Sequence, residues 1–151
     1  MARYKVVTQE DPVLRKTSSV VSEVNDHIKK IMSNMAETMY HYKGVGLAAP
    51  QVGINRRIIV VDVGDELYKL ANPEILSSQG IQDGPEGCLS VPKTYGNVKR
   101  SNYIKVSGLD ENNNAVVIEA KGFKARAFQH EIDHLNGILF TDKATEIEKE
   151  I

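Results

Sequence analysis

The chain has 151 residues, of which 41% are hydrophobic and 26% are charged, and its formal net charge is −1 at pH 7. This composition is typical of ordinary globular proteins, and the near-neutral charge gives no sign of a DNA-binding surface. The first residues contain no apolar run like that of a secretory signal, and no stretch approaches the ~18 apolar residues of a membrane span. We therefore expect a soluble, cytoplasmic protein that binds neither DNA nor a membrane.

The length predicts a single domain covering residues 1–151, and the sequence contains no internal repeat, low-complexity segment or linker. Cys88 is the only cysteine, so an intrachain disulfide is excluded. A lone thiol fits a reducing compartment, where it serves as a core residue, a metal ligand or a nucleophile.

The first half of the chain predicts one long helix. Its buried face is indicated by apolar residues at spacings of three and four, namely Ile28, Ile31, Met32, Met35 and Met39. Ser22 or Asn25 can cap the start of this helix, and Gly44 fits its end. The next segment, residues 44–53, is too rich in glycine and proline to predict regular structure.

The rest of the chain predicts strands and a second helix. Residues 56–63 and 67–76 are expected to be strands, and residues 84–92 a short extended piece. Residues 102–123 predict a hairpin around the turn DENNN, and residues 124–137 predict a helix that ends at Gly137. Because strands and helices do not alternate regularly, we predict an α+β fold. In it, small mixed or antiparallel sheets pack around the C-terminal helix that carries HEIDH, and a further helix lies near the N-terminus.

The segment QHEIDH predicts a metal site. His130 and His134 are four residues apart, so they lie one turn apart on the same helical face and can reach one ion. Glu131 is placed to face a water on that ion. The alternative is an exposed charged helix face, and the apolar neighbours argue against it: Ala127, Phe128, Ile132, Leu135 and Ile138.

Two histidines do not complete such a site, because a catalytic zinc-type centre takes three protein ligands. One protease class places a third histidine where this chain has Phe140, which cannot ligate. Spacing leaves open the acidic residues of the tail, Glu146, Glu148 and Glu150, although they are more simply a solvated charged end. Cys88 is the favoured ligand, since cysteine with two histidines is a recognised catalytic set. A cysteine nucleophile paired with a histidine is the competing interpretation.

Three segments together resemble the peptide deformylase family: GVGLAAPQ (residues 44–51), EGCLS (residues 86–90) and QHEIDH (residues 129–134). Their order and spacing match the family, and the likeness extends over essentially the whole chain. The resemblance implies a metal-dependent hydrolase that removes the N-formyl group from the N-terminal formyl-methionine of newly synthesised polypeptides and releases formate.

The resemblance also implies roles for particular residues. Cys88, His130 and His134 would hold one divalent metal ion, Fe(II) in the cell, with Zn(II), Ni(II) or Co(II) able to replace it. Glu131 would act as general base and then acid, and Gln51 with the backbone N–H of Leu89 would form the oxyanion hole. The substrate-binding residues, partly by analogy and partly by nearness to the motifs, would be Gly44, Val45, Gly46, Tyr95, Arg126 and Ala127, with Phe123 beside them. Glu86 would pair with Arg100.

The expected partners are N-formylmethionyl nascent peptides, and the protein is expected to be a monomer. Ribosome association is expected to be weak, because the tail after residue 140 is short and well-known bacterial relatives dock through a longer C-terminal helix. Two other functions stay open at this point. One is a small metalloprotease or other amidase; the other is a non-enzymatic metal-binding or ribosome-associated module, although every expected catalytic position is filled.

Overall fold

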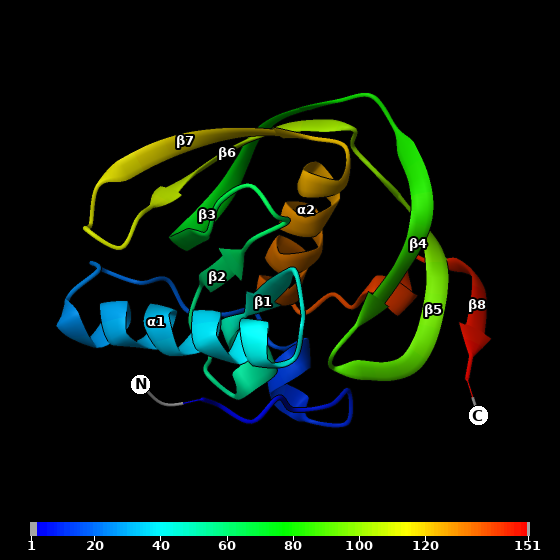
Figure 1. The fold of residues 1–151 in the computed structure, drawn as a ribbon, viewed down its shortest axis with the longest axis horizontal. Helices are drawn as coiled ribbons and strands as arrows, with labels where there is room; N and C mark the ends of the chain where they lie inside the picture. The colour runs from blue at the N-terminus through cyan, green and yellow to red at the C-terminus, as the bar shows by residue number, and fades with distance from the viewer. Residues whose placement is uncertain (1–2, 151) are drawn as a thin grey trace.

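The computed structural model describes residues 3–150, which form two antiparallel sheets and two α-helices (Figure 1). The larger sheet has the order β1-β2-β3-β6-β7, with β1 (Gly46–Ala48), β2 (Ile58–Val61), β3 (Tyr68–Gln79), β6 (Tyr103–Leu109) and β7 (Ala115–Lys121). The smaller sheet has the order β4-β5-β8, with β4 (Gln82–Cys88), β5 (Val91–Arg100) and β8 (Thr145–Lys149). The predicted α+β class is confirmed.

Helix α1 (Asp26–His41) covers one face of the larger sheet. The Asn25 side chain accepts a hydrogen bond from the backbone N–H of Ile28, which satisfies a helix N–H that would otherwise lack a partner. The methionine stripe is buried in the core against β1 and β2, as the sequence predicted. Beyond His41 the chain turns at Lys43 and enters β1, so the end of α1 sets where β1 begins.

Helix α2 (Phe123–Leu135) lies between the two sheets and is mostly buried (Figure 1). Its apolar face, which includes Phe128 and Leu135, packs on the larger sheet. Arg57, the residue before β2, donates to the carbonyl oxygen of Leu135 and so gives a partner to one of the carbonyl groups at the helix C-terminus. This packing leaves the His130–His134 face of the helix turned toward the smaller sheet. Three short 3₁₀-helices complete the described elements: η1 (Pro12–Arg15), η2 (Ala49–Val52) and η3 (Phe140–Asp142).

Most elements expected from the sequence are present, and the hairpin of β6 and β7 is confirmed. Helix α2 ends two residues before Gly137, which adopts a left-handed φ of +74°. Two expectations were wrong. Residues 44–53 are not irregular, because β1 pairs with β2 and η2 follows. The single extended piece expected over residues 84–92 is instead the end of β4, a tight turn and the start of β5, which pair with each other. The acidic tail is exposed, as expected of a solvated charged end, and part of it forms β8, which pairs with β5.

Among residues 3–150, no helix is both long enough and apolar enough to span a lipid bilayer.

Candidate metal centre

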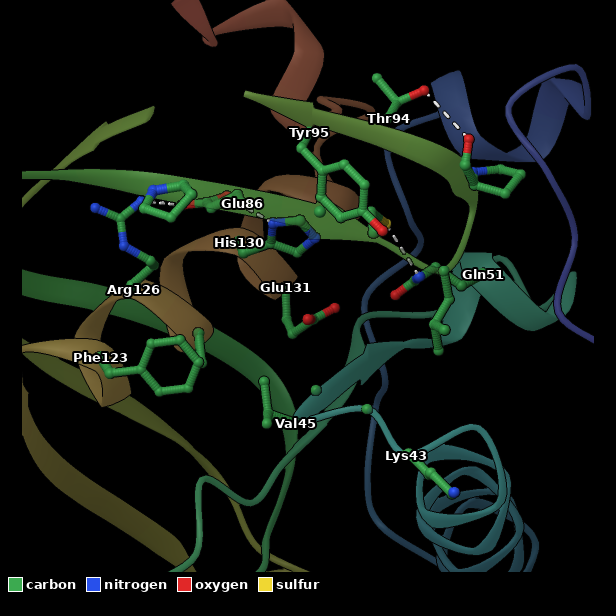
Figure 2. A pocket seen from close by; sticks show the side chains of 18 of the residues that line it. Lys43, Val45, Gln51, Glu86, Thr94, Tyr95, Phe123, Arg126, His130 and Glu131 are labelled. Carbon is green, nitrogen blue, oxygen red and sulfur yellow. Dashed lines mark hydrogen bonds and ion pairs between the residues drawn. The ribbon is translucent and has the colours of Figure 1, made fainter. Parts of the chain in front are cut away.

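A cavity of about 460 Å³ opens between β1, the first half of α2 and the strands β4 and β5 (Figure 2). This volume falls in the range of small-molecule sites, about 300–1,000 Å³. The three sequence motifs meet in its wall, although they lie far apart in the chain. The residues from these motifs that line it are Gly44, Val45, Gly46, Gln51, Glu86, Gly87, Cys88, Leu89, His130 and Glu131.

The metal site consists of Cys88, His130 and His134, whose ligand atoms all lie within 4.8 Å of one another. Cys88 comes from the end of β4, and its Sγ lies 3.3 Å from His134 Nε2. This donor set of one sulfur and two imidazoles suits both Zn(II) and Fe(II). The acidic tail residues do not contribute, because they lie exposed on β8 and after it.

Glu86 fixes the ring of His130. Its Oε1 lies 2.8 Å from His130 Nδ1, and an ionised carboxylate only accepts, so Nδ1–H is the donor and Nε2 is left for an ion. Arg100 donates two bonds of 2.9 Å to the same carboxylate, and Arg126 donates a third. Burial alone raises the pKa of Glu86, but the bonds from Arg100 and His130 outweigh it and lower the pKa to about 2. The expected pair of Glu86 and Arg100 is therefore present.

The two histidines differ in their proton affinity. Burial lowers the pKa of His134 well below its usual value, and the neighbouring His130 lowers it further, so His134 is a neutral ligand at pH 7. Burial also lowers the pKa of His130, but its contacts with Cys88, Glu131 and Glu86 outweigh this and raise the pKa well above its usual value. A metal ion must displace a proton from His130, so metal binding is coupled to proton release.

Glu131 is buried on the same helix and points into the cavity (Figure 2). Its Oε1 has no hydrogen-bond partner among the described residues, which is what a carboxylate that accepts from a bound water requires. Burial raises the pKa of Glu131 to about 7, with the charge of His130 opposing the shift. The backbone of Gly46 lies so close that a Cβ there would be 2.5 Å from Glu131 Oε2.

The carboxamide of Gln51 is held in one orientation. Its Oε1 accepts from the backbone N–H of Ala48 at 2.9 Å, so its Nε2 points to the opposite side. There Nε2 donates to Ser90 Oγ at 3.3 Å and lies 3.5 Å from Cys88 Sγ. An N–H donor is therefore directed toward the metal site. Leu89 follows Cys88 in the tight turn between β4 and β5 and lines the same cavity.

The residues expected to bind substrate also line the cavity. Val45, Phe123 and Tyr95 are exposed at its mouth, while Ala127 lies deeper. Arg126 is almost fully buried, and its Nη1 donates to Glu86 and to the carbonyl oxygen of Val98.

The sequence analysis missed three residues of this site. Ser90 accepts from Gln51, and Asp133 binds Arg100 at 2.5 Å. Phe140, excluded as a ligand, stacks on the ring of His130. Ser90 and Asp133 stand inside the motifs EGCLS and QHEIDH, which was the only available signal, because neither residue type indicates its partner from the sequence.

A buried helix with H-E-x-x-H, a cysteine ligand from a neighbouring strand and a directed amide donor define a metal-dependent amide hydrolase. The sequence model of the polypeptide deformylase family matches residues 3–150. The chain belongs to this family.

Individual relatives agree with this assignment over nearly their whole length. The chain is 51% identical to the peptide deformylase of Pelotomaculum thermopropionicum, covering 99% of this chain and 96% of that protein. It is 53% identical to the enzyme of Carboxydothermus hydrogenoformans, covering 97% of each. The crystal structure of peptide deformylase from Thermotoga maritima superimposes with a TM-score of 0.93 at 44% identity, covering 96% of this chain and 99% of that one.

Proposed function

We propose that this chain removes the N-formyl group from the N-terminal formyl-methionine of nascent bacterial polypeptides and releases formate, with Glu131 as the group that moves the proton. The observation that carries this proposal is the buried Glu131 carboxylate beside the Cys88, His130 and His134 site, whose Oε1 has no hydrogen-bond partner among residues 3–150. The cellular metal is proposed to be Fe(II), with Zn(II), Ni(II) and Co(II) as functional replacements. A divalent ion bound there supplies Lewis acidity and lowers the pKa of water toward about 7.

Each of the surrounding residues has one task in this reaction. Glu131 accepts the proton of the attacking water and later delivers it to the amine, whose departure requires protonation. The oxygen of the formyl group gains negative charge as its carbon becomes tetrahedral. Gln51 Nε2 and the backbone N–H of Leu89 are the proposed donors to that oxygen. Both are neutral, so they stabilise the charge without protonating it.

The shape of the cavity favours a formyl group over an internal peptide bond. Gly46 lies against Glu131, and the residues that follow it, Leu47, Ala48 and Ala49, are fully buried. This wall leaves little room for residues on the N-terminal side of the bond that is cut, which a protease would need. The edge of β1 that faces away from β2 can pair with the substrate backbone, and the methionine side chain is proposed to contact Val45, Phe123 and Ala127.

The proposed setting is the bacterial cytoplasm, where a monomer acts on chains that emerge from the ribosome with at most weak ribosome binding. The test is formate release from a formyl-methionyl peptide by protein purified without oxygen and loaded separately with Fe(II), Ni(II) or Zn(II). An acetyl-methionyl peptide is the control. Rapid formate release with little acetate, and its loss in Glu131→Gln at unchanged metal content, would support the proposal. Cleavage of internal peptide bonds without formate would refute it.

A further inference from the structure

A hydrogen bond outside the cavity joins the last turn of α1 to the end of β2. Tyr40 Oη donates to Asp62 Oδ2 at 2.6 Å. Tyr40 lies near the C-terminus of α1, and Asp62 is the first residue after β2. Neither residue lines the cavity, and neither has a task in the reaction proposed above.

Asp62 also holds the chain just before β1. Its backbone N–H donates to the carbonyl oxygen of Val45 at 2.9 Å, one step beyond the pair Gly46–Val61 that begins the β1–β2 ladder. Its second carboxylate oxygen, Oδ1, accepts from the backbone N–H of Gly64 at 2.8 Å. Both oxygens of the carboxylate are thus bound, which fixes the backbone of Asp62 opposite Val45.

These contacts enclose residues 41–45, the segment that connects α1 to β1. On the helix side, the N–H of Gly44 bonds to the carbonyl of Met39 at 3.0 Å, and on the strand side Asp62 holds Val45. Residues 41–43 and 45 are exposed, so the segment has few packing contacts and depends on hydrogen bonds for its position. Figure 2 shows Val45 on this segment, at the cavity wall.

The bond from Asp62 also decides which way β1 faces. In an antiparallel pair the main-chain groups of successive residues point alternately toward the partner strand and away from it. Because the carbonyl of Val45 points toward β2, the N–H and C=O of Gly46 point to the open side. The N–H of Ala48 fits this alternation, since it bonds to the side chain of Gln51. β1 is the edge strand of its sheet, and this open edge is the one proposed above to bind the substrate backbone.

The hydroxyl group of Tyr40 is not needed for packing. The side chain is 50% exposed, so a phenylalanine would cover the same neighbours. The hydrogen bond to Asp62, burial and the charge of Asp62 raise the pKa of Tyr40 to about 12. The hydroxyl therefore keeps its proton, and remains a donor, from neutral pH to above pH 10.

We propose that Tyr40 and Asp62 are positioning residues for substrate binding. Their hydrogen bond fixes Val45 against β2, and thereby the direction of the main-chain groups of Gly46. This inference rests on the proposed function and adds to it two residues outside the cavity. The metal ligands and Glu131 lie on β4 and α2, so loss of the bond should leave the chemical step nearly unchanged and should appear in KM.

The test compares formate release from formyl-Met-Ala-Ser by the wild type and by Tyr40→Phe, each loaded with the same metal. Tyr40→Phe should raise KM and lower kcat/KM about three- to tenfold, the range of one partly exposed hydrogen bond, with kcat within about twofold. Tyr103→Phe is the matched control, since it removes a hydroxyl bonded to Glu119 on β6 and β7, outside the cavity lining, and should change neither constant. Wild-type kcat/KM in Tyr40→Phe, or an equal loss in Tyr103→Phe, would overturn the inference. Absence of formate from the wild type would instead refute the proposed function.

Changes at Asp62 show whether the bond itself is what matters. Asp62→Ala removes the acceptor and should raise KM at least as much as Tyr40→Phe. The double variant should then be no worse than Asp62→Ala, because both changes remove the same bond. Asp62→Asn should recover most of the loss, since its amide can donate to Tyr40 while its oxygen accepts from Gly64. Additive losses in the double variant would mean that the two side chains act separately, and the inference would be wrong.

Hydrogen exchange of one amide gives a readout that does not depend on activity. The Asp62 N–H that bonds to Val45 should exchange about three- to tenfold faster in Tyr40→Phe than in the wild type, measured by NMR on the zinc-loaded protein. Amides of α2 should keep their protection, which separates this effect from general loss of stability. A raised KM with unchanged exchange at Asp62 would show that the hydroxyl does not act through Val45, contrary to the proposal.

Discussion

Replacing Gly46 with alanine tests whether the position of the Glu131 carboxylate controls the rate. The new Cβ would lie 2.5 Å from Glu131 Oε2 and 2.9 Å from both Cδ and Cγ. Ordinary contacts between heavy atoms lie at about 3.5–4.0 Å, so the carboxylate must retreat by roughly 1 Å. A displacement of that size at a catalytic group costs on the order of 100-fold in rate. We expect Gly46→Ala to lower kcat by about this factor.

The fold and the metal site should survive this change, because the clash involves only the Glu131 side chain, with no backbone atom and none of the three ligands. The assay is formate release at saturating peptide, with metal content and thermal unfolding measured on the same sample. Gly44→Ala is the comparison on the same segment: its Cβ would meet Leu89 Cδ1 at an ordinary 3.4 Å and would not touch Glu131, so any loss there should appear in KM, because Gly44 lines the cavity. Wild-type kcat in Gly46→Ala would refute the reasoning, as would loss of the metal or of the folded state.

Three further variants probe the residues around the ion. Gln51→Ala should lower kcat by about 100- to 1,000-fold with the metal retained, as expected for loss of one oxyanion donor, measured by formate release. Asp133→Asn should weaken the hydrogen bonds that run from Arg100 through Glu86 to His130, and so lower Co(II) affinity by about 10- to 100-fold, measured by chelator competition. The control is Lys143→Gln, which removes only the solvent-side partner of Asp133 and should leave the Co(II) affinity unchanged. Glu86 has a pKa lowered from 4.5 to about 2, so its contribution to the stability of the metal-free protein is present above pH 4.5 and is lost as the pH falls toward 2. Urea titrations should show a loss of about 3 kcal/mol in the free energy of unfolding across that range, and a smaller loss in Glu86→Gln.

Local periodicity explains why the sequence alone predicted α2 and its ligands. Histidines four residues apart share a helical face whatever the rest of the fold does, so His130 and His134 needed no tertiary information. Cys88 followed from the chemistry of the incomplete ligand set and from the resemblance. Its approach to His134 depends on β4 ending beside α2, which no local pattern reveals.

The missed elements are those whose formation depends on distant backbone. Strand β1 is three residues long and pairs through main-chain groups with β2, so no alternation of side chains marks it. Strand β8 is exposed at all five positions, and an all-exposed strand resembles a solvated tail in sequence. The contact of Asp133 with Arg100 spans 33 residues, and each side chain alone suggests only a surface charge.

The two arginines beside the metal site raise an electrostatic question, because buried positive charge opposes the binding of a divalent cation. Arg100 and Arg126 both bind Glu86, and Arg100 also binds Asp133, so their charges are largely compensated within the cluster. What they provide is a carboxylate that stays ionised down to a pH near 2. An ionised Glu86 always accepts from His130 Nδ1, so His130 Nε2 stays directed at the ion. The cation is then attracted mainly by Cys88, the only ligand that can carry a full negative charge. The arginines hold Glu86, and through it the ring of His130, in position, and their positive charge lowers the affinity for the cation.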